Sequence, residues 1–259
     1  MMARLMRAAG PALIIGIGGL VLWEVSFAII QPEAFVLPAP SEIMAAFFGN
    51  FDEIWTATRN TGYIVVTGLI GGIALGVLWA LLVSRFRTAN ETLTPLAIAL
   101  NAIPIIALAP IFNAWFGLLS PVSNQSIVVI LVFFPVFINT TKGLTEVQPD
   151  EIELMRSYAA SPWEVARKVR VPNALPYFFT SLKIASSLAV IGAIVAEYFG
   201  GRQDALGPLI VQNAGLTRYA DAWAAVLAGS LLGIVLYLLT GVFERASMPW
   251  EHAAETAGS

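Results

Sequence analysis

Six apolar stretches of the chain are each long enough to cross a lipid bilayer as a helix. A spanning helix needs about 20 apolar residues, because the hydrocarbon core of a bilayer is about 30 Å thick. The stretches are residues 11–30, 61–83, 93–119, 122–141, 174–196 and 222–243. They predict an all-α polytopic membrane protein with six transmembrane helices, and we expect residues 1–259 to form a single transmembrane domain.

The composition agrees with this class and excludes several others. Charged residues make up 12% of the chain, about half of the share in a soluble domain. There is no Cys, and His252 is the one histidine, so a disulfide scaffold and a Cys/His metal site are excluded. The formal net charge of −3 gives no indication of nucleic-acid binding.

The distribution of Lys and Arg predicts the orientation, because basic residues are enriched in cytoplasmic loops. With the N-terminus inside, eleven basic residues lie in or near the cytoplasm and three lie outside. The outer three are Arg59, Arg202 and Arg218, and Lys183 is counted inside because it can extend toward that surface. We therefore expect both termini in the cytoplasm.

The third and fourth stretches are the least regular. Pro104 and Pro110 interrupt the third, and the polar residues 123–126 lie near the start of the fourth. Proline inside a span is tolerated only where neighbouring helices or water satisfy the freed backbone groups. The first stretch is not expected to be a cleavable signal peptide, because it is long and no small-residue cleavage site follows it.

Two stretches carry glycines on one helix face. Gly68, Gly72 and Gly76 are spaced four residues apart, and so are Gly229 and Gly233. This spacing lets another helix backbone approach closely. The approaching helix belongs either to the same subunit or to a second subunit, and the sequence leaves both alternatives open.

The segment between the fourth and fifth stretches is longer than a connector needs to be. Residues 146–172 contain two helix starts. Pro149, followed by two acidic residues, suits the first turn of one helix. Ser161 and Glu164 form a capping box at the start of another, and Pro172 is expected to end it.

Each of these short helices has an apolar face that requires a partner. The faces pack either against the ends of the chain's own spans or in a groove on a separate cytosolic protein. The first face consists of Ile152, Met155, Tyr158 and Ala159, and the second of Trp163, Ala166 and Val169.

This loop resembles the EAA loop of the permease subunits of bacterial ABC importers that depend on a binding protein. Residues 153–161 (ELMRSYAAS) match its first half, residues 163–172 (WEVARKVRVP) match its second half, and NALPYF follows. The customary Gly of the turn is Ala159 here, which carries a conformational cost if the turn needs a left-handed backbone.

The resemblance covers roughly residues 35–250 and includes residues 101–117 and 189–201. These two segments look like the corresponding helices of permeases for nitrate, sulfonates, taurine, thiamine-precursor pyrimidines and riboflavin. The resemblance implies the type I ABC importer permease architecture and a location in the bacterial inner membrane.

In that family the loop carries the coupling helix, which docks on the ATPase subunit. The resemblance therefore implies these docking residues: Glu153, Arg156, Ser157, Tyr158, Ala159, Ala160, Ser161, Trp163 and Pro172.

The partners follow from the same resemblance. The chain has no G-x-x-x-x-G-K-[ST] phosphate loop, so it cannot bind ATP by that route. The resemblance implies no directly bound cofactor and no catalysis by this chain. ATP and Mg²⁺ would be used by two separate ABC ATPase subunits. A second copy of the permease, as a homodimer, and a periplasmic or lipid-anchored binding protein would complete the working unit.

Polar groups inside spans are costly and are therefore candidates for a substrate pathway. A flat aromatic cargo would also suit the Phe-rich segment around Pro135 if it faces a cavity. The cargo stays open between a small anion, such as nitrate, a sulfonate or taurine, and a small heterocyclic vitamin precursor. The candidate pathway residues are Asn101, Asn113, Phe134, Asn139 and Glu197, each of which could instead connect neighbouring helices.

The alternative function is a secondary transporter driven by an ion gradient. Such folds often contain inverted repeats and intramembrane carboxylates. The two halves of this chain show no convincing repeat, and only Glu24 and Glu197 could serve as coupling acids. A membrane enzyme would need a catalytic constellation at matched depth, and nothing resembles a channel selectivity filter.

Overall fold

The computed structural model describes residues 2–30 and 37–249, and all the regular structure in these residues is helical. In chain order the elements are α1 (Met2–Ile30), α2 (Pro40–Gly49), α3 (Phe51–Ser84), α4 (Arg87–Leu100), η1 (Ile105–Leu108), α5 (Ala109–Phe116), α6 (Pro121–Thr145), α7 (Pro149–Ser157), α8 (Pro162–Val165), η2 (Ala166–Arg170), α9 (Val171–Glu197), α10 (Leu206–Gly215) and α11 (Tyr219–Ser247).

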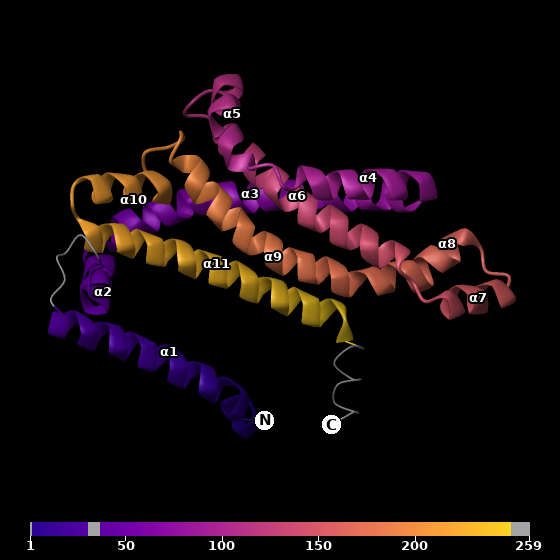
Figure 1. The fold of residues 1–259 in the computed structure, drawn as a ribbon, viewed down its shortest axis with the longest axis horizontal. Helices are drawn as coiled ribbons and strands as arrows, with labels where there is room; N and C mark the ends of the chain where they lie inside the picture. The colour runs from indigo at the N-terminus through magenta and orange to yellow at the C-terminus, as the bar shows by residue number, and fades with distance from the viewer. Residues whose placement is uncertain (1, 31–36, 250–259) are drawn as a thin grey trace.

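Four long helices, α3, α6, α9 and α11, run along the long axis of the molecule (Figure 1). We call the end with α7 and α8 the loop end, and the end with α2 and α10 the α10 end. Among the described residues, these four helices are long and apolar enough to cross a membrane without a break, α9 being counted together with α8 and η2. The prediction of an all-α polytopic membrane protein is confirmed.

The third predicted span, which the sequence shows interrupted by proline, is broken in the structure and counts as a span only if its two bent parts are taken together. The chain bends by 77° between α4 and the helix that ends in α5. Pro104 lies at the break, where its missing N–H and its fixed φ interrupt the helical hydrogen bonds. As a result α5 projects sideways from the bundle (Figure 1).

Helix α1 lies at the edge of the molecule, and its main contacts are with α2. Its apolar stretch Ile14–Ile30 is shorter than the four long helices. The Glu24 carboxylate accepts hydrogen bonds from the backbone N–H and the hydroxyl of Ser41, at 3.1 and 2.7 Å. This bond joins α1 to the first turn of α2, so Glu24 already has a protein partner.

Helix α6 lies at the centre of the packing and contacts α3, α4, α5 and α9. A Cβ atom added at Gly72 would lie 2.6 Å from Val132 Cβ and 2.7 Å from the Val129 carbonyl oxygen. Gly68 and Gly76 meet Val128 and Val136 in the same way. Because both series of residues ascend together, α3 and α6 run parallel.

These glycines therefore allow close contact between helices of the same subunit. Gly229 follows the same rule, since an added Cβ would lie 2.7 Å from Ile194 Cδ1 on α9. The alternative of a second-subunit partner is wrong for Gly68, Gly72, Gly76 and Gly229.

We expect Gly72→Ala to destabilise the bundle although alanine is the better helix former. Overpacking of a tight contact costs about 1–3 kcal/mol, whereas the gain in helix propensity is at most about 1 kcal/mol. Gly241→Ala on α11 is the matched control, because nothing lies within 4 Å of its added Cβ. Thermal unfolding in detergent should show a lower Tm for Gly72→Ala only; equal Tm values for the two variants would contradict this packing.

Candidate functional site

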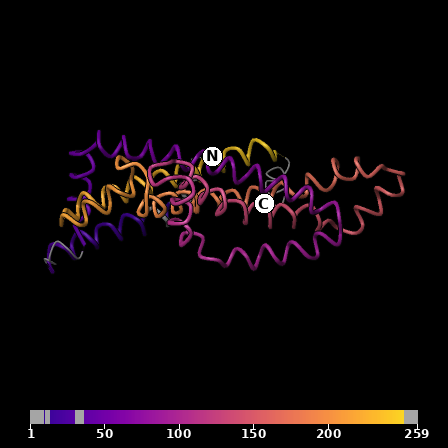
Figure 2. The backbone as a smooth tube through the Cα atoms, turned by 90° about the horizontal axis from the view of Figure 1, so that it is seen from above, coloured from indigo at the N-terminus to yellow at the C-terminus, as the bar shows by residue number. Residues whose placement is uncertain are grey.

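The loop between α6 and α9 carries exposed aromatic side chains outside the long apolar helices. Helices α7 and α8 extend past the other helices at the loop end in both views (Figures 1 and 2). No residue of either helix is buried. Tyr158 is 76% exposed, Trp163 is 74% exposed and Leu154 is 57% exposed. The structure therefore leaves an apolar surface at this end without a partner in the described part of the chain.

The turn after α7 is a Schellman motif. The Ala160 N–H donates to the Met155 carbonyl at 3.0 Å, and the Ala159 N–H donates to the Arg156 carbonyl at 2.9 Å. Ala159 has φ 52°, in the left-handed region. The turn thus has the conformation that glycine adopts most easily, and alanine occupies it at a cost.

The capping box at the start of α8 is formed as expected. The Glu164 N–H donates to Ser161 Oγ at 3.3 Å, and the Glu164 carboxylate accepts from the Ser161 N–H at 2.9 Å. The backbone hydrogen bond from Ser161 is the largest effect that lowers the pKa of Glu164 below its ordinary value. The carboxylate is therefore ionised at neutral pH, as an N-terminal cap requires.

The residues of each predicted apolar face differ in exposure. Ile152 and Met155 are half-buried, whereas Tyr158 and Ala159 are exposed. In the second helix Trp163 is exposed, while Ala166 and Val169 are half-buried. The half-buried residues are thus partly covered by the chain itself, whereas the aromatic side chains Tyr158 and Trp163 are not. Sequence analysis missed Leu154, which lies one position off the predicted face.

The expectation that Pro172 ends the second helix is wrong. Helix α8 continues through the π turn η2 into α9, so that Pro162–Glu197 is one 36-residue helix. The Val171 N–H donates to the carbonyl of Ala166, five residues earlier. This shift places Pro172 in the first turn of α9, where a residue without an N–H is tolerated.

The remaining predicted docking residues lie on the same loop. Glu153, Arg156, Ser157 and Ser161 are exposed, and Ala160 and Pro172 are half-buried. The Ser157 hydroxyl donates to the Leu154 carbonyl of its own helix at 2.7 Å. The predicted docking residues therefore all lie at the loop end, and their role in docking stays a prediction.

Two predicted pathway residues, Asn113 and Glu197, make hydrogen bonds between helices at the α10 end. Asn113 Nδ2 donates to the Phe199 carbonyl at 3.0 Å, and Asn113 Oδ1 accepts from the Ser123 hydroxyl at 2.6 Å. Asn113 and Glu197 are both buried. Asn113 thus connects α5, α6 and the segment that follows α9.

Glu197 connects three helices through a separate set of hydrogen bonds. Its carboxylate accepts from the Thr61 hydroxyl at 3.0 Å and from the Gly207 N–H at 2.9 Å. Thr61 Oγ1 in turn accepts from the Leu206 N–H at 2.9 Å. The carboxylate lies at the N-terminus of α10, where backbone N–H groups have no partner within the helix. In this structure Glu197 attaches α10 to α3 and α9.

The other three predicted pathway residues take no part in the hydrogen bonds of Asn113 and Glu197. Asn101 is exposed at the break after α4. Phe134 is buried inside the bundle. Asn139 is half-buried, and its Nδ2 donates to the Pro135 carbonyl of its own helix at 2.9 Å. The structure does not bring the five residues together into one cavity, and the pathway assignment stays a prediction.

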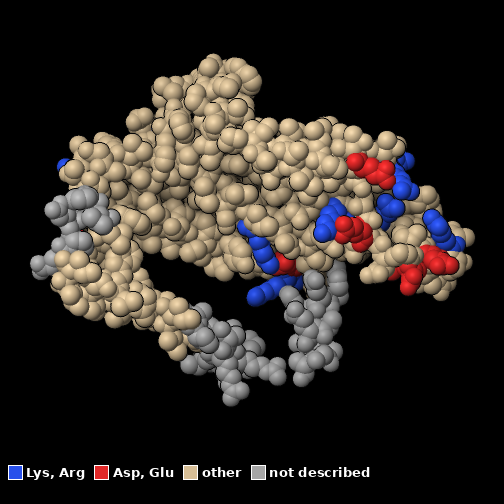
Figure 3. All heavy atoms as spheres, in the orientation of Figure 1, with Lys and Arg blue, Asp and Glu red and all other residues tan. Residues whose placement is uncertain are grey.

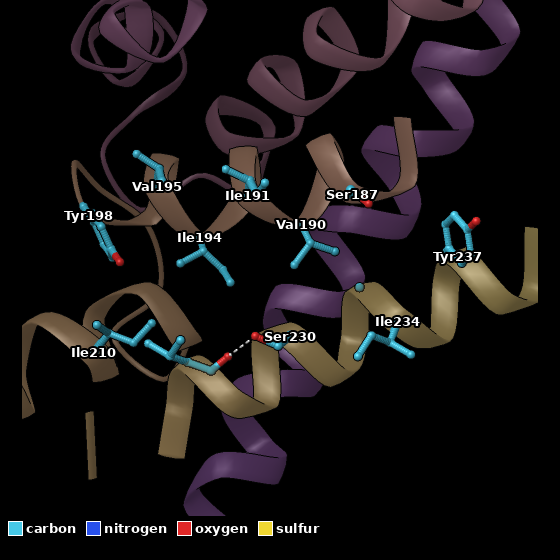
Figure 4. Close-up of a pocket in the computed structure, with 13 residues that line it drawn as sticks. Ser187, Val190, Ile191, Ile194, Val195, Tyr198, Ile210, Ser230, Ile234 and Tyr237 are labelled. Carbon is cyan, nitrogen blue, oxygen red and sulfur yellow. Dashed lines mark hydrogen bonds between the residues drawn. The ribbon is translucent and has the colours of Figure 1, made fainter. Parts of the chain in front are cut away.

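A groove of about 470 Å³ lies between α9 and α11. Figure 4 shows Val190 and Ile194 on α9 pointing toward α11, which contributes Ile234 to the lining. The Ser230 hydroxyl bonds back to its own helix, donating to the Val226 carbonyl at 2.9 Å. None of the lining residues carries a charge, so this groove has no group that selects an ion.

The charged side chains on the face shown in Figure 3 gather toward the loop end, while most of that face is uncharged. Lys183 on α9 forms an ion pair with Glu244 on α11. Both side chains are less than one-third exposed. The pair neutralises a basic group that would otherwise lie uncompensated in a long apolar helix.

Comparisons with known proteins identify relatives over most of the chain. Residues 72–250 match the family described as "Binding-protein-dependent transport system inner membrane component". The formylaminopyrimidine transport permease protein ThiX of Halalkalibacterium halodurans is 34% identical, over 89% of this chain and 92% of that protein. The riboflavin transport system permease protein RibX of Chloroflexus aurantiacus is 30% identical, over 90% of this chain and 87% of that protein.

Solved structures support the fold. The crystal structure of an amino acid ABC transporter with histidines is similar with a TM-score of 0.62 and 15% identity. The similarity covers 77% of this chain and 96% of that chain. At this identity the similarity shows the fold alone.

We expect Ala159→Gly to stabilise the turn between α7 and α8, because glycine relieves the cost of the left-handed backbone, about 1–2 kcal/mol. Hydrogen exchange of the amides in this turn should slow by a few-fold. Ala160→Gly is the control, since its φ is not positive, and it should speed exchange. Faster exchange in both variants would contradict the assigned turn.

Proposed function

Since the chain belongs to the family of binding-protein-dependent transport system inner membrane components, we propose that it is the transmembrane permease subunit of an ATP-driven importer. In this proposal residues 146–172 dock on a separate ATPase subunit. The observation that carries the proposal is the pair of exposed aromatic side chains, Tyr158 and Trp163, on either side of the ordered turn at the loop end.

The geometry of the loop suits a docking surface. Aromatic residues are frequent among the residues that dominate protein–protein affinity. Here two of them flank a turn that a Schellman motif and a capping box hold in one conformation. A surface ordered before binding loses little conformational entropy when it binds. The loop end is therefore suited to a groove on a partner protein.

We assign the loop end to the cytoplasm and the α10 end to the outer side, with both termini cytoplasmic. Two copies of this chain, two ATPase subunits and a periplasmic or lipid-anchored binding protein would form the transporter. ATP and Mg²⁺ are bound and used by the ATPase, and this chain contributes no catalytic group. The binding protein delivers the cargo to the α10 end.

Movement of the docked loop would reach the membrane through one helix. Because α8 continues through η2 into α9, a displacement of α8 tilts α9 directly. Helix α9 packs on α6, and α6 packs on α3. In the proposed cycle, closure of the ATPases moves these helices so that a path between two permease copies opens alternately to each side.

Among the candidate pathway residues, Asn101 and Asn139 best fit this path. Asn101 is exposed at the break after α4, and Asn139 is half-buried. Asn113, Phe134 and Glu197 are buried within one subunit, and the bonds of Asn113 and Glu197 support a role in holding helices together.

For the cargo we propose a small heterocyclic vitamin precursor rather than a small anion. Among the described residues, Lys183 is the basic side chain in the central part of a long helix, and Glu244 is its partner. A free cation for a small anion is thus missing from that part of the bundle. The names of the two relatives at 34% and 30% identity, which refer to formylaminopyrimidine and riboflavin, support the same class.

The docking assignment predicts that Tyr158→Ala and Trp163→Ala each weaken binding of the ATPase by roughly 30-fold, the effect of losing about 2 kcal/mol at an interface. Titration of the purified permease with its ATPase measures this. Trp55→Ala on α3 is the control, because that side chain is also exposed, at 58%, but lies far from the loop. Unchanged binding in both loop variants would refute the docking assignment. Transport that continues with a disabled ATPase and stops with an ionophore would instead support the secondary transporter.

The cargo assignment predicts selective uptake. In proteoliposomes with the permease, its ATPase and its binding protein, uptake of labelled formylaminopyrimidine or riboflavin should exceed uptake of nitrate or taurine by about tenfold or more, equivalent to about 1.4 kcal/mol. Preferential uptake of either anion would overturn the heterocycle assignment and leave the docking assignment unaffected.

A further inference from the structure

The base of the loop is a backbone-to-backbone contact between α6 and α9. Gly143, in the last turns of α6, is buried. A Cβ atom added there would lie 2.7 Å from the Cα of Ala174 and 2.9 Å from Cδ2 of Tyr177. The two helices therefore touch at their loop-end termini, and any larger residue at position 143 would separate them.

The side chain of Asn173 forms hydrogen bonds across this contact. Asn173 Nδ2 donates to the Gly143 carbonyl at 2.8 Å and to the Glu146 carbonyl at 3.2 Å. The last carbonyls of a helix have no partner within the helix. Asn173, from the first turn of α9, thus supplies hydrogen bonds at the C-terminal end of α6. An Asn amide has two N–H groups, which matches the two carbonyls.

The position of Asn173 relative to the π turn is also informative. The π turn Ala166–Arg170 ends three residues before Asn173. π turns are local irregularities that often occur at functional sites. On one side of Asn173 lies the arm formed by α7, α8 and the π turn, and on the other side lies the long part of α9. The hydrogen bonds of Asn173 are located where the arm meets the bundle.

We propose that Asn173 is a positioning residue that makes the base of the loop a fixed pivot. Its bonds to Gly143 and Glu146 hold the loop-end termini of α6 and α9 together while the ATPase moves the arm. The movement then tilts α6 and α9 as one unit. Without these bonds the two termini separate, and the arm moves without moving the bundle. This inference rests on the proposed function.

The pivot is distinct from the docking surface. Tyr158 and Trp163 are exposed on the arm, whereas Asn173 and Gly143 are not exposed. Changing Asn173 should therefore leave ATPase binding intact and affect only the transfer of movement. This separation makes the inference testable apart from docking.

The test is Asn173→Asp in the complete transporter, with permease, ATPase and binding protein in proteoliposomes. Aspartate keeps the shape of asparagine and, when ionised, donates no hydrogen bond. We expect copurification of the ATPase and basal ATP hydrolysis to stay close to the unmodified protein. Cargo transported per ATP hydrolysed should fall by about tenfold, the factor that 1.4 kcal/mol produces in an equilibrium.

The control is Asn90→Asp on α4, where Asn90 Oδ1 accepts from the Thr94 hydroxyl of its own helix at 2.8 Å, a bond that aspartate keeps. This variant should transport normally. Gly143→Ala is a second test, because it separates the same helices without changing Asn173, and it should also uncouple hydrolysis from transport. Asn173→His, which keeps a ring N–H donor, should recover part of the coupling.

Each outcome separates the inference from the proposed function. Normal coupling in Asn173→Asp would overturn the pivot. Loss of ATPase copurification in Asn173→Asp would also overturn it, because the residue would then act in docking or folding. If the unmodified permease itself neither binds nor stimulates an ATPase, the proposed function fails instead.

Discussion

The close approach of helix backbones around α6 is the interaction on which the remaining structure depends. In a bilayer, lipid tails are as apolar as leucine side chains, so burial of apolar surface does little to hold helices together. Contact between small residues and β-branched residues replaces it. Gly72 against Val132 is typical of the contact between α3 and α6, and Gly143 against Ala174 joins α6 to α9 at the loop end. These contacts make α3, α6 and α9 a unit on which the shorter elements are placed.

Different hydrogen bonds hold the helices together at the two ends of this unit. At the α10 end, buried polar side chains connect helices, and Glu197 binds the N-terminus of α10 and the hydroxyl of Thr61. At the loop end, a Schellman motif and the capping box of Ser161 and Glu164 shape the arm, and Asn173 joins it to the bundle. Hydrogen bonds are effective at both places because a buried polar group without a partner costs about 1–3 kcal/mol. The arm itself remains exposed, which is consistent with a surface that receives a partner.

Some features of the site were predictable and others were not. The capping box of Ser161 and Glu164 and the cost of a left-handed Ala159 follow from short-range backbone chemistry, and both predictions agree with the structure. The role of Pro172 was predicted wrongly, because a π turn changed the hydrogen-bond register before it. The polar pathway candidates were chosen by one rule, namely that polar residues inside spans are costly. The rule does not distinguish Asn101, which is exposed, from Glu197, which already has two partners.

The amino-acid sequence by itself determined the helical membrane class, the approximate spans, the presence of a capped arm and the family resemblance. The class and the spans depend on hydropathy over about 20 residues, and the caps of the arm depend on residues three or four positions apart, so short stretches of sequence are sufficient to predict them. Only the tertiary structure decided that Gly68, Gly72 and Gly76 pack inside one subunit, that the third span bends by 77°, and that Asn173 reaches the end of α6. The physical reason is that each depends on which residues meet in space: Gly72 and Val132 are far apart in the chain, and their contact exists only after the helices have assembled.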